Sequence, residues 1–376
     1  MQQKTLDKPK PLVSVCTPTF NRRPFIAAMM ECFNHQTYPR DRMEWIIVDD
    51  GTDPVGDLVS HHPCVRYFNL ADKISLGKKR NLMHEKAQGE IIVYMDDDDY
   101  YPPERVSHAV TTLLDHRKRR TGIKLVGSSE MCIYFKGVGG GSEGQMVQFG
   151  PYGPNHATAA TFAFWKDLLS DMGLAYEDSA CLAEERAFLR GYTVPMAQLD
   201  PMKVILVVSH EHNTFDKRGL LKNLGRDKHM RVSPKTVSDF IKEPALLRFY
   251  MHEVDAALKL YEPGHPSMKP DVLQQINEKM KTQGKKHAQD QDAILKTVIT
   301  FKAPNAENRN MTVEELIQTV QSQAVKLEKM RELCNQKIRQ NSDLIATIQD
   351  RDEVIAAHLE TIERQGAMLD TQLTNP

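Results

Sequence analysis

The sequence predicts an α/β protein built on a parallel sheet and followed by a helical tail. Two observations in the first 116 residues lead to this prediction. Short apolar runs alternate with segments whose apolar residues recur at helical spacing, and the apolar runs end at polar or acidic clusters. Strands that are apolar throughout and separated by helices are typical of a parallel sheet with helices on both faces.

The length and composition agree with this fold class. The chain has 376 residues, about two domains at ~150 residues each, which is enough to bury a full core. Hydrophobic residues make up 40% of the chain and charged residues 26%. These values are ordinary for a globular protein and exclude a disordered or fibrous one.

The first strand is predicted at residues 11–16, and it ends in the turn-prone Thr17-Pro18-Thr19. A helix is expected over residues 23–33, because its apolar residues fall on one stripe. That stripe consists of Ile26, Met29, Met30 and Phe33.

Two further pairs of strand and helix follow. The strand at 44–48 stops at Asp49-Asp50-Gly51 and precedes a helix over 77–87. The strand at 90–95 is halted by four aspartates and precedes a helix over 103–116. Ligands of such sheets bind at the carboxyl ends of the strands. We therefore expect the polar clusters that follow the three strands to lie together.

From about residue 124 the pattern changes. Three short β-like runs, at 124–126, 131–135 and 146–149, flank a glycine-rich stretch at 137–144. The glycines indicate a flexible hairpin tip rather than a phosphate cradle, because no helix start follows them.

The core is predicted to close with a helix over 182–190 and a buried strand over 202–209, which ends at His210. We expect this core to span residues 10–255. A polar, lysine-rich helical linker is expected over 256–310.

A long helix is predicted over residues 311–372. It opens with the capping-box sequence Thr312-Val313-Glu314-Glu315. Apolar residues then follow at alternating three- and four-residue steps, which is the seam of a coiled coil. The seam consists of Ile345, Ile348, Ile355, Leu359, Ile362 and Leu369. Asp352 and Gly366 interrupt it, so we expect a weak homodimer, with folding back onto the chain's own helices as the alternative.

Charge and cysteine usage exclude several classes of protein. Lys and Arg number 49 against 50 Asp and Glu, so the net charge is −1 and no basic field favours nucleic acid. No stretch approaches the ~18 apolar residues of a membrane span, and the polar N-terminus does not read as a signal peptide. The six cysteines form no CxxC or CxxH pair. That pattern favours reduced thiols in a cytoplasmic protein over disulfides or a zinc site.

The clearest chemical signal is the run of four aspartates at residues 96–99, directly after a buried strand. Like charges ~4 Å apart repel by about 1 kcal/mol or more unless a cation lies between them. Mg²⁺ and Mn²⁺ relieve such repulsion, typically through one or two carboxylates together with substrate phosphates. A solvated acidic loop is the alternative, and the buried strand before the run favours the metal.

Two further signals follow neighbouring strands. Asp49 offers a carboxylate to a nucleobase or a ribose, although Asp50-Gly51 is also typical of a tight turn. The sequence Gly77-Lys78-Lys79-Arg80-Asn81 is a basic helix start whose cations suit a diphosphate. Taken alone, such a sequence is more often a solvated helical face.

In their order and spacing these motifs resemble the nucleotide-binding half of the family 2 glycosyltransferases, which have the GT-A fold. The resemblance rests on residues 13–22, 48–52, 77–81 and 89–99. It is close over about 11–110, weaker to about 215, and absent from the tail. It implies a Rossmann-like nucleotide-diphospho-sugar transferase core. It also implies inverting transfer of a sugar from a UDP- or GDP-linked donor to a hydroxyl of a glycan, protein or small-molecule acceptor.

The resemblance also implies roles for residues that meet the nucleotide. Pro18 and Thr19 match the family's first loop, which contacts the nucleotide through its backbone. Asp49 matches the carboxylate that meets the base, and Arg80 matches an arginine near the base and diphosphate.

The aspartate run matches the family's D-x-D region. Asp98 is our choice for the direct ligand of Mn²⁺ or Mg²⁺, with Asp96 and Asp97 on ribose or water. Because four aspartates stand in a row, the register is open by one residue. His210 matches a late histidine that often binds the metal in this fold, and an exposed loop histidine is the equal alternative.

Two acidic pairs compete for the role of catalytic base. Glu177-Asp178 has the residue types usual in the family, but the expected helix does not follow it directly. Glu184-Glu185 has the expected sequence context, with Glu in place of Asp. We favour Glu185, with Glu184 next, because a glutamate serves as a base when it lies within hydrogen-bond reach of the acceptor hydroxyl.

Other functions fit parts of the sequence. A sugar nucleotidyltransferase shares the fold class, but residues 17–21 are unlike the glycine- and arginine-rich loop expected after its first strand. A non-catalytic coiled-coil scaffold would use the 311–372 helix, yet the candidate ligand positions in the core are all filled by competent residues. A dinucleotide dehydrogenase is excluded because no GxGxxG follows a strand.

Overall fold

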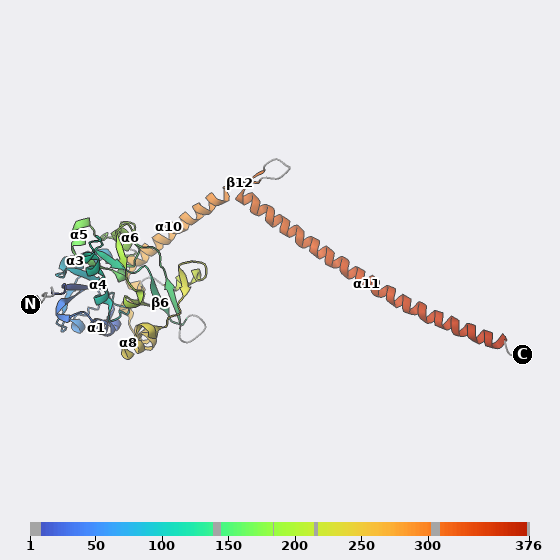
Figure 1. Cartoon of the computed structure of the whole chain (residues 1–376), viewed down its shortest axis with the longest axis horizontal. Coiled ribbons are helices and arrows are strands. Elements are labelled where there is room, and N and C mark those ends of the chain that lie inside the picture. Colours follow the sequence, from blue (N-terminus) through green and yellow to red (C-terminus); the bar gives the residue numbers. More distant parts are fainter. Residues whose placement is uncertain (1–8, 138–143, 183, 214–216, 302–308, 374–376) are drawn as a thin grey trace, which may run out of the picture. The chain divides into compact units, whose positions relative to one another are not determined.

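The computed structural model describes residues 9–137, 144–182, 184–213, 217–301 and 309–373. The chain forms two compact units, Met1–Met280 and Lys281–Pro376, which we describe separately (Figure 1).

The first unit is organised around a seven-stranded sheet in the order β3-β2-β1-β4-β8-β5-β9. Its strands are β1 (Val13–Thr19), β2 (Met43–Asp49), β3 (Val65–Asn69), β4 (Ile91–Tyr94), β5 (Leu125–Gly127), β8 (Ala163–Trp165) and β9 (Met196–Gln198). The four strands β3, β2, β1 and β4 are parallel. The sequence predicted β1, β2 and β4 as parallel strands but did not predict β3. The sheet as a whole is mixed, because β8 runs antiparallel to both β4 and β5. Parallel neighbours are usually joined by a helical crossover, whereas the chain reaches β8 from the second sheet. The expectation of a parallel strand therefore does not apply to β8.

The second sheet has the order β10-β6-β7-β11. Its strands are β6 (Met131–Phe135), β7 (Gln145–Phe149), β10 (Leu206–Ser209) and β11 (Met230–Val232). β6 and β7 pair antiparallel, and most of the glycine-rich stretch between them lies outside the described residues. The strand predicted over 202–209 is shorter than expected, because a 3₁₀ turn occupies Pro201–Lys203.

Helices cover both faces of the seven-stranded sheet. They are α1 (Ile26–Asn34), α2 (Gly56–Val59), α3 (Leu76–Lys86), α4 (Arg105–Lys118), α5 (Asp167–Met172) and α6 (Glu184–Phe188). Alternate residues of β2 pack into different apolar clusters: Trp45 joins α1 and α4 on one face, whereas Ile46 joins α3, α5 and α6 on the other. This alternation follows from the two-residue period of a strand.

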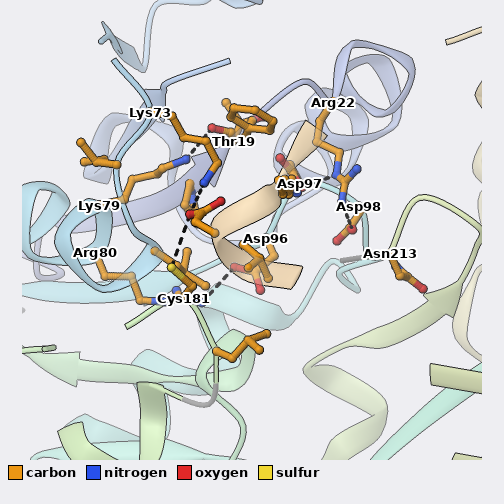
Figure 2. A pocket seen from close by; sticks show the side chains of 18 of the residues that line it. Thr19, Arg22, Lys73, Lys79, Arg80, Asp96, Asp97, Asp98, Cys181 and Asn213 are labelled. Carbon is orange, nitrogen blue, oxygen red and sulfur yellow. Dashed lines mark hydrogen bonds and ion pairs between the residues drawn. The ribbon is translucent and has the colours of Figure 1, made fainter. Parts of the chain in front are cut away.

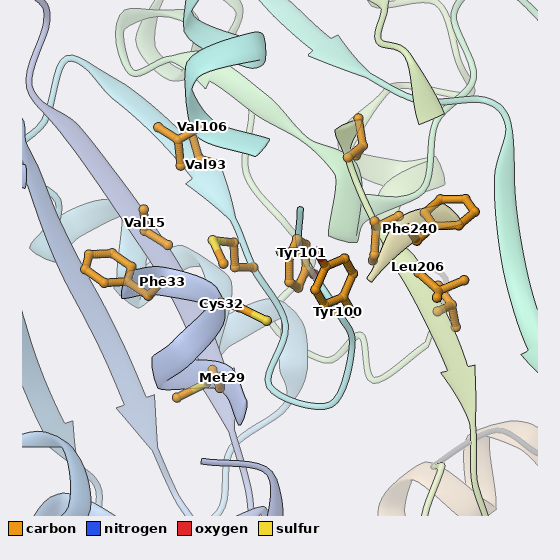
Figure 3. Packing of buried hydrophobic residues seen from close by; sticks show 14 of the residues in the cluster. Val15, Met29, Cys32, Phe33, Val93, Tyr100, Tyr101, Val106, Leu206 and Phe240 are labelled. Atoms are coloured by element: carbon orange, nitrogen blue, oxygen red, sulfur yellow. The ribbon is translucent and has the colours of Figure 1, made fainter. Parts of the chain in front are cut away.

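The residues that follow the aspartate run connect the two sheets. Tyr100 exchanges backbone hydrogen bonds of 3.1 and 2.9 Å with Leu206 of β10. Tyr100 and Tyr101 are fully buried, between the layer that holds Phe33 and the side of the core that holds Leu206 and Phe240 (Figure 3). The acidic run is therefore held on a rigid, apolar base.

The remaining part of the first unit is helical. It contains α7 (Val237–Phe240), α8 (Pro244–Arg248), a π-helical turn (Phe249–Glu253), α9 (Val254–Lys259) and the start of α10 (Pro270–Leu295). Further 3₁₀ turns lie at Arg23–Phe25, Arg40–Arg42, Ala159–Thr161, Lys217–Asn223, Glu262–Gly264 and Pro266–Met268. The predicted core boundary at residue 255 falls inside α9.

The second unit contains the end of α10, the antiparallel pair β12 (Val298–Phe301) and β13 (Arg309–Thr312), and α11 (Val313–Leu373). The capping box predicted at the start of α11 is formed: the Glu315 backbone N–H donates to Thr312 Oγ1 at 3.1 Å, and the Thr312 N–H donates to Glu315 Oε2 at 2.9 Å. In the described part of the chain, every helix is too short or too polar to cross a membrane.

Candidate active site

A cavity of about 290 Å³ opens at the carboxyl ends of β1 and β4 (Figure 2). Six of the residues singled out from the sequence line it: Pro18, Thr19, Arg80, Asp96, Asp97 and Asp98. The first loop, the basic helix start and the acidic run, which lie far apart in the sequence, therefore share one cavity. This is where ligands bind in open α/β sheets.

The basic wall of the cavity comes from α3. Ser75 caps this helix by accepting a hydrogen bond from the Lys78 N–H at 3.2 Å. Lys79 Nζ donates to the Thr19 carbonyl at 2.8 Å and pairs with the buried Asp50. Burial lowers the pKa of Lys79, and the Asp50 carboxylate opposes that effect. α3 is thus tied to the first loop by a charged hydrogen bond.

Arg80 is 2% exposed and lies against two aromatic rings. Its guanidinium carbon is 4.5 Å from the Tyr94 ring centroid and 5.8 Å from that of Tyr176. Its Nη2 is 3.5 Å from Asp96 Oδ1. The rings fix the planar guanidinium at the cavity wall, a geometry suited to a phosphate or carboxylate.

The structure separates the four aspartates into two groups. Asp96, Asp97 and Asp98 line the cavity. Asp99 turns away: its Oδ1 accepts a hydrogen bond from the Val208 N–H at 3.2 Å, and its carbonyl accepts one from Tyr250 at 2.9 Å. Burial, followed by the charge of Asp98, raises the pKa of Asp99 well above its ordinary value. Asp99 is therefore held as part of the core.

Arg22 joins the two central aspartates. It ends the first motif of the resemblance, residues 13–22, but no role was predicted for it from the sequence. Its Nε lies 3.6 Å from Asp97 Oδ1 and its Nη2 3.3 Å from Asp98 Oδ2 (Figure 2). Burial, followed by the charge of Asp98, raises the pKa of Asp97 to about 7. Burial also disfavours the charged form of Asp98, but the neighbouring His210 and the charge of Arg22 outweigh it and hold its pKa below the ordinary range. Asp98 is the carboxylate of this pair that stays ionised.

His210 lies directly behind Asp98, with its Nε2 3.3 Å from Asp98 Oδ2. Burial lowers the pKa of His210 to about 4, so the imidazole is neutral at pH 7. Asn213 Nδ2 lies 2.8 Å from the same Nε2, and Asn213 Oδ1 accepts from the His210 backbone N–H. Because an amide nitrogen only donates, Nε2 is an acceptor in this arrangement.

Asp98 and His210 therefore fit a divalent cation, since two acceptor atoms that face one another are stabilised by a shared positive charge. Among the described residues, no group of three or more His, Cys, Asp or Glu side chains is placed to hold a metal ion. A cation at this point would take its other ligands from phosphate or water, as Mg²⁺ often does.

Asp49 is fully buried at the end of β2. Its carboxylate accepts hydrogen bonds from the Gly51 N–H at 2.9 Å, the Val55 N–H at 2.9 Å and the Tyr67 hydroxyl at 2.8 Å. These bonds hold the turn after β2. Its role toward a nucleobase stays a prediction.

The two acidic pairs that compete for the role of base flank, in the sequence, two residues that line the cavity, Cys181 and Leu182. Asp178 is exposed, and its Oδ1 accepts from Asn81 Nδ2 of α3 at 3.0 Å. Glu185 is half-buried on α6. Burial raises the pKa of the Tyr192 phenol, and the charge of the nearby Glu185 raises it further. Glu184 begins α6, and its side chain lies outside the described residues. The choice of base stays a prediction.

Several cavity residues have no counterpart in the sequence predictions. Arg22 and Lys73 line the cavity from loops, and Lys217 lines it from the start of a 3₁₀ turn. Lys269 and Asp271 line it from the region expected to be a linker. Lys79 belongs to the basic motif predicted at the start of α3, but no role of its own was predicted for it. No local pattern distinguishes Lys269 from the many other lysines around it.

Comparison with known proteins agrees with this architecture. Residues 14–130 match the profile of glycosyl transferase family 2. The poly(ribitol-phosphate) beta-N-acetylglucosaminyltransferase TarS of Staphylococcus aureus is 29% identical over 137 residues, which are 34% of this chain and 21% of TarS. The glycosyltransferase AglE of Haloferax volcanii is 26% identical over 132 residues, 34% of this chain and 42% of AglE. The chain thus spans about a fifth of TarS and about two fifths of AglE.

Solved structures of similar proteins include S. aureus TarS 1-349 in complex with UDP-GlcNAc. It is 23% identical, has a TM-score of 0.41, and the match covers 53% of this chain and 59% of that one. The mannosyltransferase PcManGT from Pyrobaculum calidifontis, in complex with GDP-Man and Mn²⁺, is 16% identical with a TM-score of 0.41. That match covers 71% of this chain and 86% of PcManGT.

Proposed function

Because residues 14–130 match the family 2 glycosyltransferases within a GT-A-like core, we propose that the protein transfers a sugar from a nucleotide-diphosphate sugar to an acceptor hydroxyl. The observation that carries this proposal is the meeting of Thr19, Arg80 and Asp96–Asp98 around one cavity. Cationic and anionic groups of this kind suit a diphosphate and a bridging cation.

The reaction we propose is metal-dependent and inverting. Asp98 and His210 would hold Mn²⁺ or Mg²⁺, which when bound supplies positive charge against the diphosphate. Arg80 would meet the negative charge that develops on the leaving nucleoside diphosphate. Glu185 would take the proton of the acceptor hydroxyl as that oxygen attacks the anomeric carbon and the bond to the diphosphate breaks.

A thermal-shift panel tests this proposal. The full-length protein is heated with UDP, GDP or the corresponding monophosphates, each with and without Mn²⁺. A ligand at 100 times its dissociation constant should stabilise the fold by about 2.7 kcal/mol. We expect this for one diphosphate, and more strongly with Mn²⁺. If neither diphosphate raises the melting temperature under any condition, the proposal fails.

We further propose that α11 associates with a second copy of itself. The described seam residues are exposed, and the same heptad positions nearer the start of the helix hold Ile317, Val320, Leu327 and Ile338. Arg331 and Asn341 interrupt this part of the seam. A helix with an apolar stripe is marginal in water unless another surface covers that stripe.

A further inference from the structure

The segment that follows α9 is bound to the first loop of the cavity. We call residues 261–275 the closing segment. Asn21 Nδ2 donates to the Pro263 carbonyl at 2.7 Å, and Tyr261 donates to Asp53 at 2.8 Å. Gly264 approaches so closely that an added Cβ would lie 2.9 Å from both the Asn21 carbonyl oxygen and His212 Nδ1. This end of the closing segment is therefore packed without spare room.

The other end of the closing segment is bound across the cavity. Asp271 pairs with Lys73 from the loop before α3. Gln275 accepts a hydrogen bond from the Cys181 N–H at 3.1 Å and donates to the Ser179 carbonyl at 2.7 Å. The closing segment, drawn in pale orange in Figure 2, thus crosses among the side chains that line the cavity.

Lys269 lies between these two sets of contacts and lines the cavity. Its Nζ is 5.4 Å from the centroid of the Phe20 ring, the same distance as Lys73 Nζ. Burial, followed by the charge of Arg22, lowers the pKa of Lys269 to about 7, and the carboxylates of Asp97 and Asp98 oppose that effect. Lys269 therefore places its amine beside these carboxylates, where the negative charge of a bound diphosphate would favour the ammonium form.

The charges around the cavity favour an anionic ligand. Its lining contains six cationic side chains: Arg22, Lys73, Lys79, Arg80, Lys217 and Lys269. It contains four carboxylates: Asp96, Asp97, Asp98 and Asp271. The lining therefore has a formal excess of two positive charges. Four of the ten side chains are buried, where charge interactions are stronger than in water: Arg22, Lys79, Arg80 and Asp97.

We propose that Lys269 binds the diphosphate of the donor, so that the closing segment completes a donor site whose other walls come from the family 2 domain. The inference rests on the proposed function, and it adds a binding residue from outside the region that matches the family, residues 14–130. A lysine ammonium is a compact charge that suits a phosphate oxygen without requiring a fixed fork geometry.

The test compares binding of UDP and UMP, or of GDP and GMP if the wild type prefers guanosine, by calorimetry in the presence of Mn²⁺. The full-length wild type is compared with Lys269→Met, Lys269→Gln and Lys269→Arg. Loss of a charge-assisted hydrogen bond should weaken diphosphate binding about ten- to a hundred-fold. Monophosphate binding should change by less than about two-fold, and Lys269→Arg should retain most of the affinity for the diphosphate.

Lys279→Met is the matched control, because Lys279 is an exposed lysine on α10. It should bind both nucleotides like the wild type. Equal losses for mono- and diphosphate in both neutral variants would mean that Lys269 only supports the fold, and unchanged binding would also overturn the proposal. A wild type that binds neither diphosphate would instead show that the proposed function is wrong.

Discussion

The cavity at the ends of β1 and β4 and the helix α11 place their side chains in opposite ways. The cavity buries charge: Arg80 is 2% exposed and Asp97 7%. α11 exposes apolar side chains: Leu327 is 63% exposed and Ile362 62%. Both arrangements are unfavourable for an isolated chain, because buried charge loses hydration and exposed apolar surface orders water.

The two regions differ in how far contacts within the chain offset this unfavourable free energy. Buried charges in the cavity pair with one another, as Arg22 does with Asp97 and Asp98, so the site is preorganised. The described seam of α11 is exposed along its length. We infer that the cavity is built to receive a small anionic ligand, whereas α11 is built to receive another helix.

The largest effect is expected at Asp98. Asp98→Asn keeps the size of the side chain but removes its charge, so it should lower donor turnover by on the order of 10³-fold or more and abolish the Mn²⁺-dependent part of diphosphate stabilisation. Release of nucleoside diphosphate and thermal shift measure the two effects. Undiminished turnover would end the metal hypothesis.

Asp99→Asn is the matched control for that experiment. Burial raises the pKa of Asp99 well above its ordinary value, and an asparagine oxygen can accept the same hydrogen bond from the Val208 N–H. We expect turnover within about two-fold of the wild type, since a swap that preserves hydrogen bonding is nearly neutral. Loss of turnover here, with Asp98→Asn active, would shift the metal-binding register by one residue.

The next effect concerns the base. Glu185→Gln keeps the shape of the side chain and loses its ability to accept a proton, so kcat should fall about 10²- to 10⁴-fold with donor binding little changed. Single-turnover rates with a fixed acceptor measure this. If Asp178→Asn shows that loss and Glu185→Gln does not, Asp178 is the base.

A third prediction tests the apolar side of the comparison. The full-length protein should be a dimer by light scattering at tens of micromolar, and a chain cut near Pro304 should be a monomer with its sugar transfer intact. Ile348→Lys should weaken the dimer because it buries a charge in the seam. Gln336→Lys, on the opposite face of α11, should not. A monomeric full-length protein would contradict self-association.

Cys334 reports the direction of the two helices. It is exposed and falls on the same three-four spacing as Ile338 and Ile345. In a parallel, in-register pair it faces its own copy, so mild oxidation should crosslink the dimer, and Cys334→Ser should prevent this. A dimer that resists crosslinking would be antiparallel or out of register.

The smallest effect is expected where α3 meets the loop before α6. Gly77 donates its N–H to the Ala180 carbonyl at 2.8 Å, and an added Cβ would collide with the Glu177 carbonyl oxygen. Gly77→Ala should therefore lower the free energy of unfolding by about 1–3 kcal/mol. Denaturant unfolding measures it. Gly153→Ala, with open space around it, should be close to neutral, and equal losses in both variants would contradict the packing argument.

Local patterns predicted the elements that depend on local interactions. Continuous apolar runs predicted β1, β2 and β4, and apolar residues at helical spacing predicted the helices α1 and α3 between them. The Thr312–Glu315 capping box is present as expected. The strands that were not predicted from the sequence are β3, β8, β9, β11, β12 and β13. β3 is only partly buried and mixes polar with apolar residues, and β8 has three residues, which is too short to show a period.

The site was predictable in part for the same reason. Motifs that follow strands are local, so Thr19, Arg80 and the acidic run could be selected from the amino-acid order alone. The closing segment could not, because its contacts join residues that are distant in sequence: Asn21 and Pro263 are 242 residues apart. No periodicity or motif spacing in the sequence indicates a contact between two residues so far apart.

Side-chain periodicity and charge are properties of the local sequence. They were therefore enough to specify the α/β order of the core, the acidic and basic ends of its strands and helices, and the apolar seam of α11. The direction of each aspartate was not specified in this way: Asp96, Asp97 and Asp98 face the cavity, where Lys269 joins them, while Asp99 faces β10. Four identical side chains carry no local signal of direction, so the packing of the chain around them determines which ones meet the ligand.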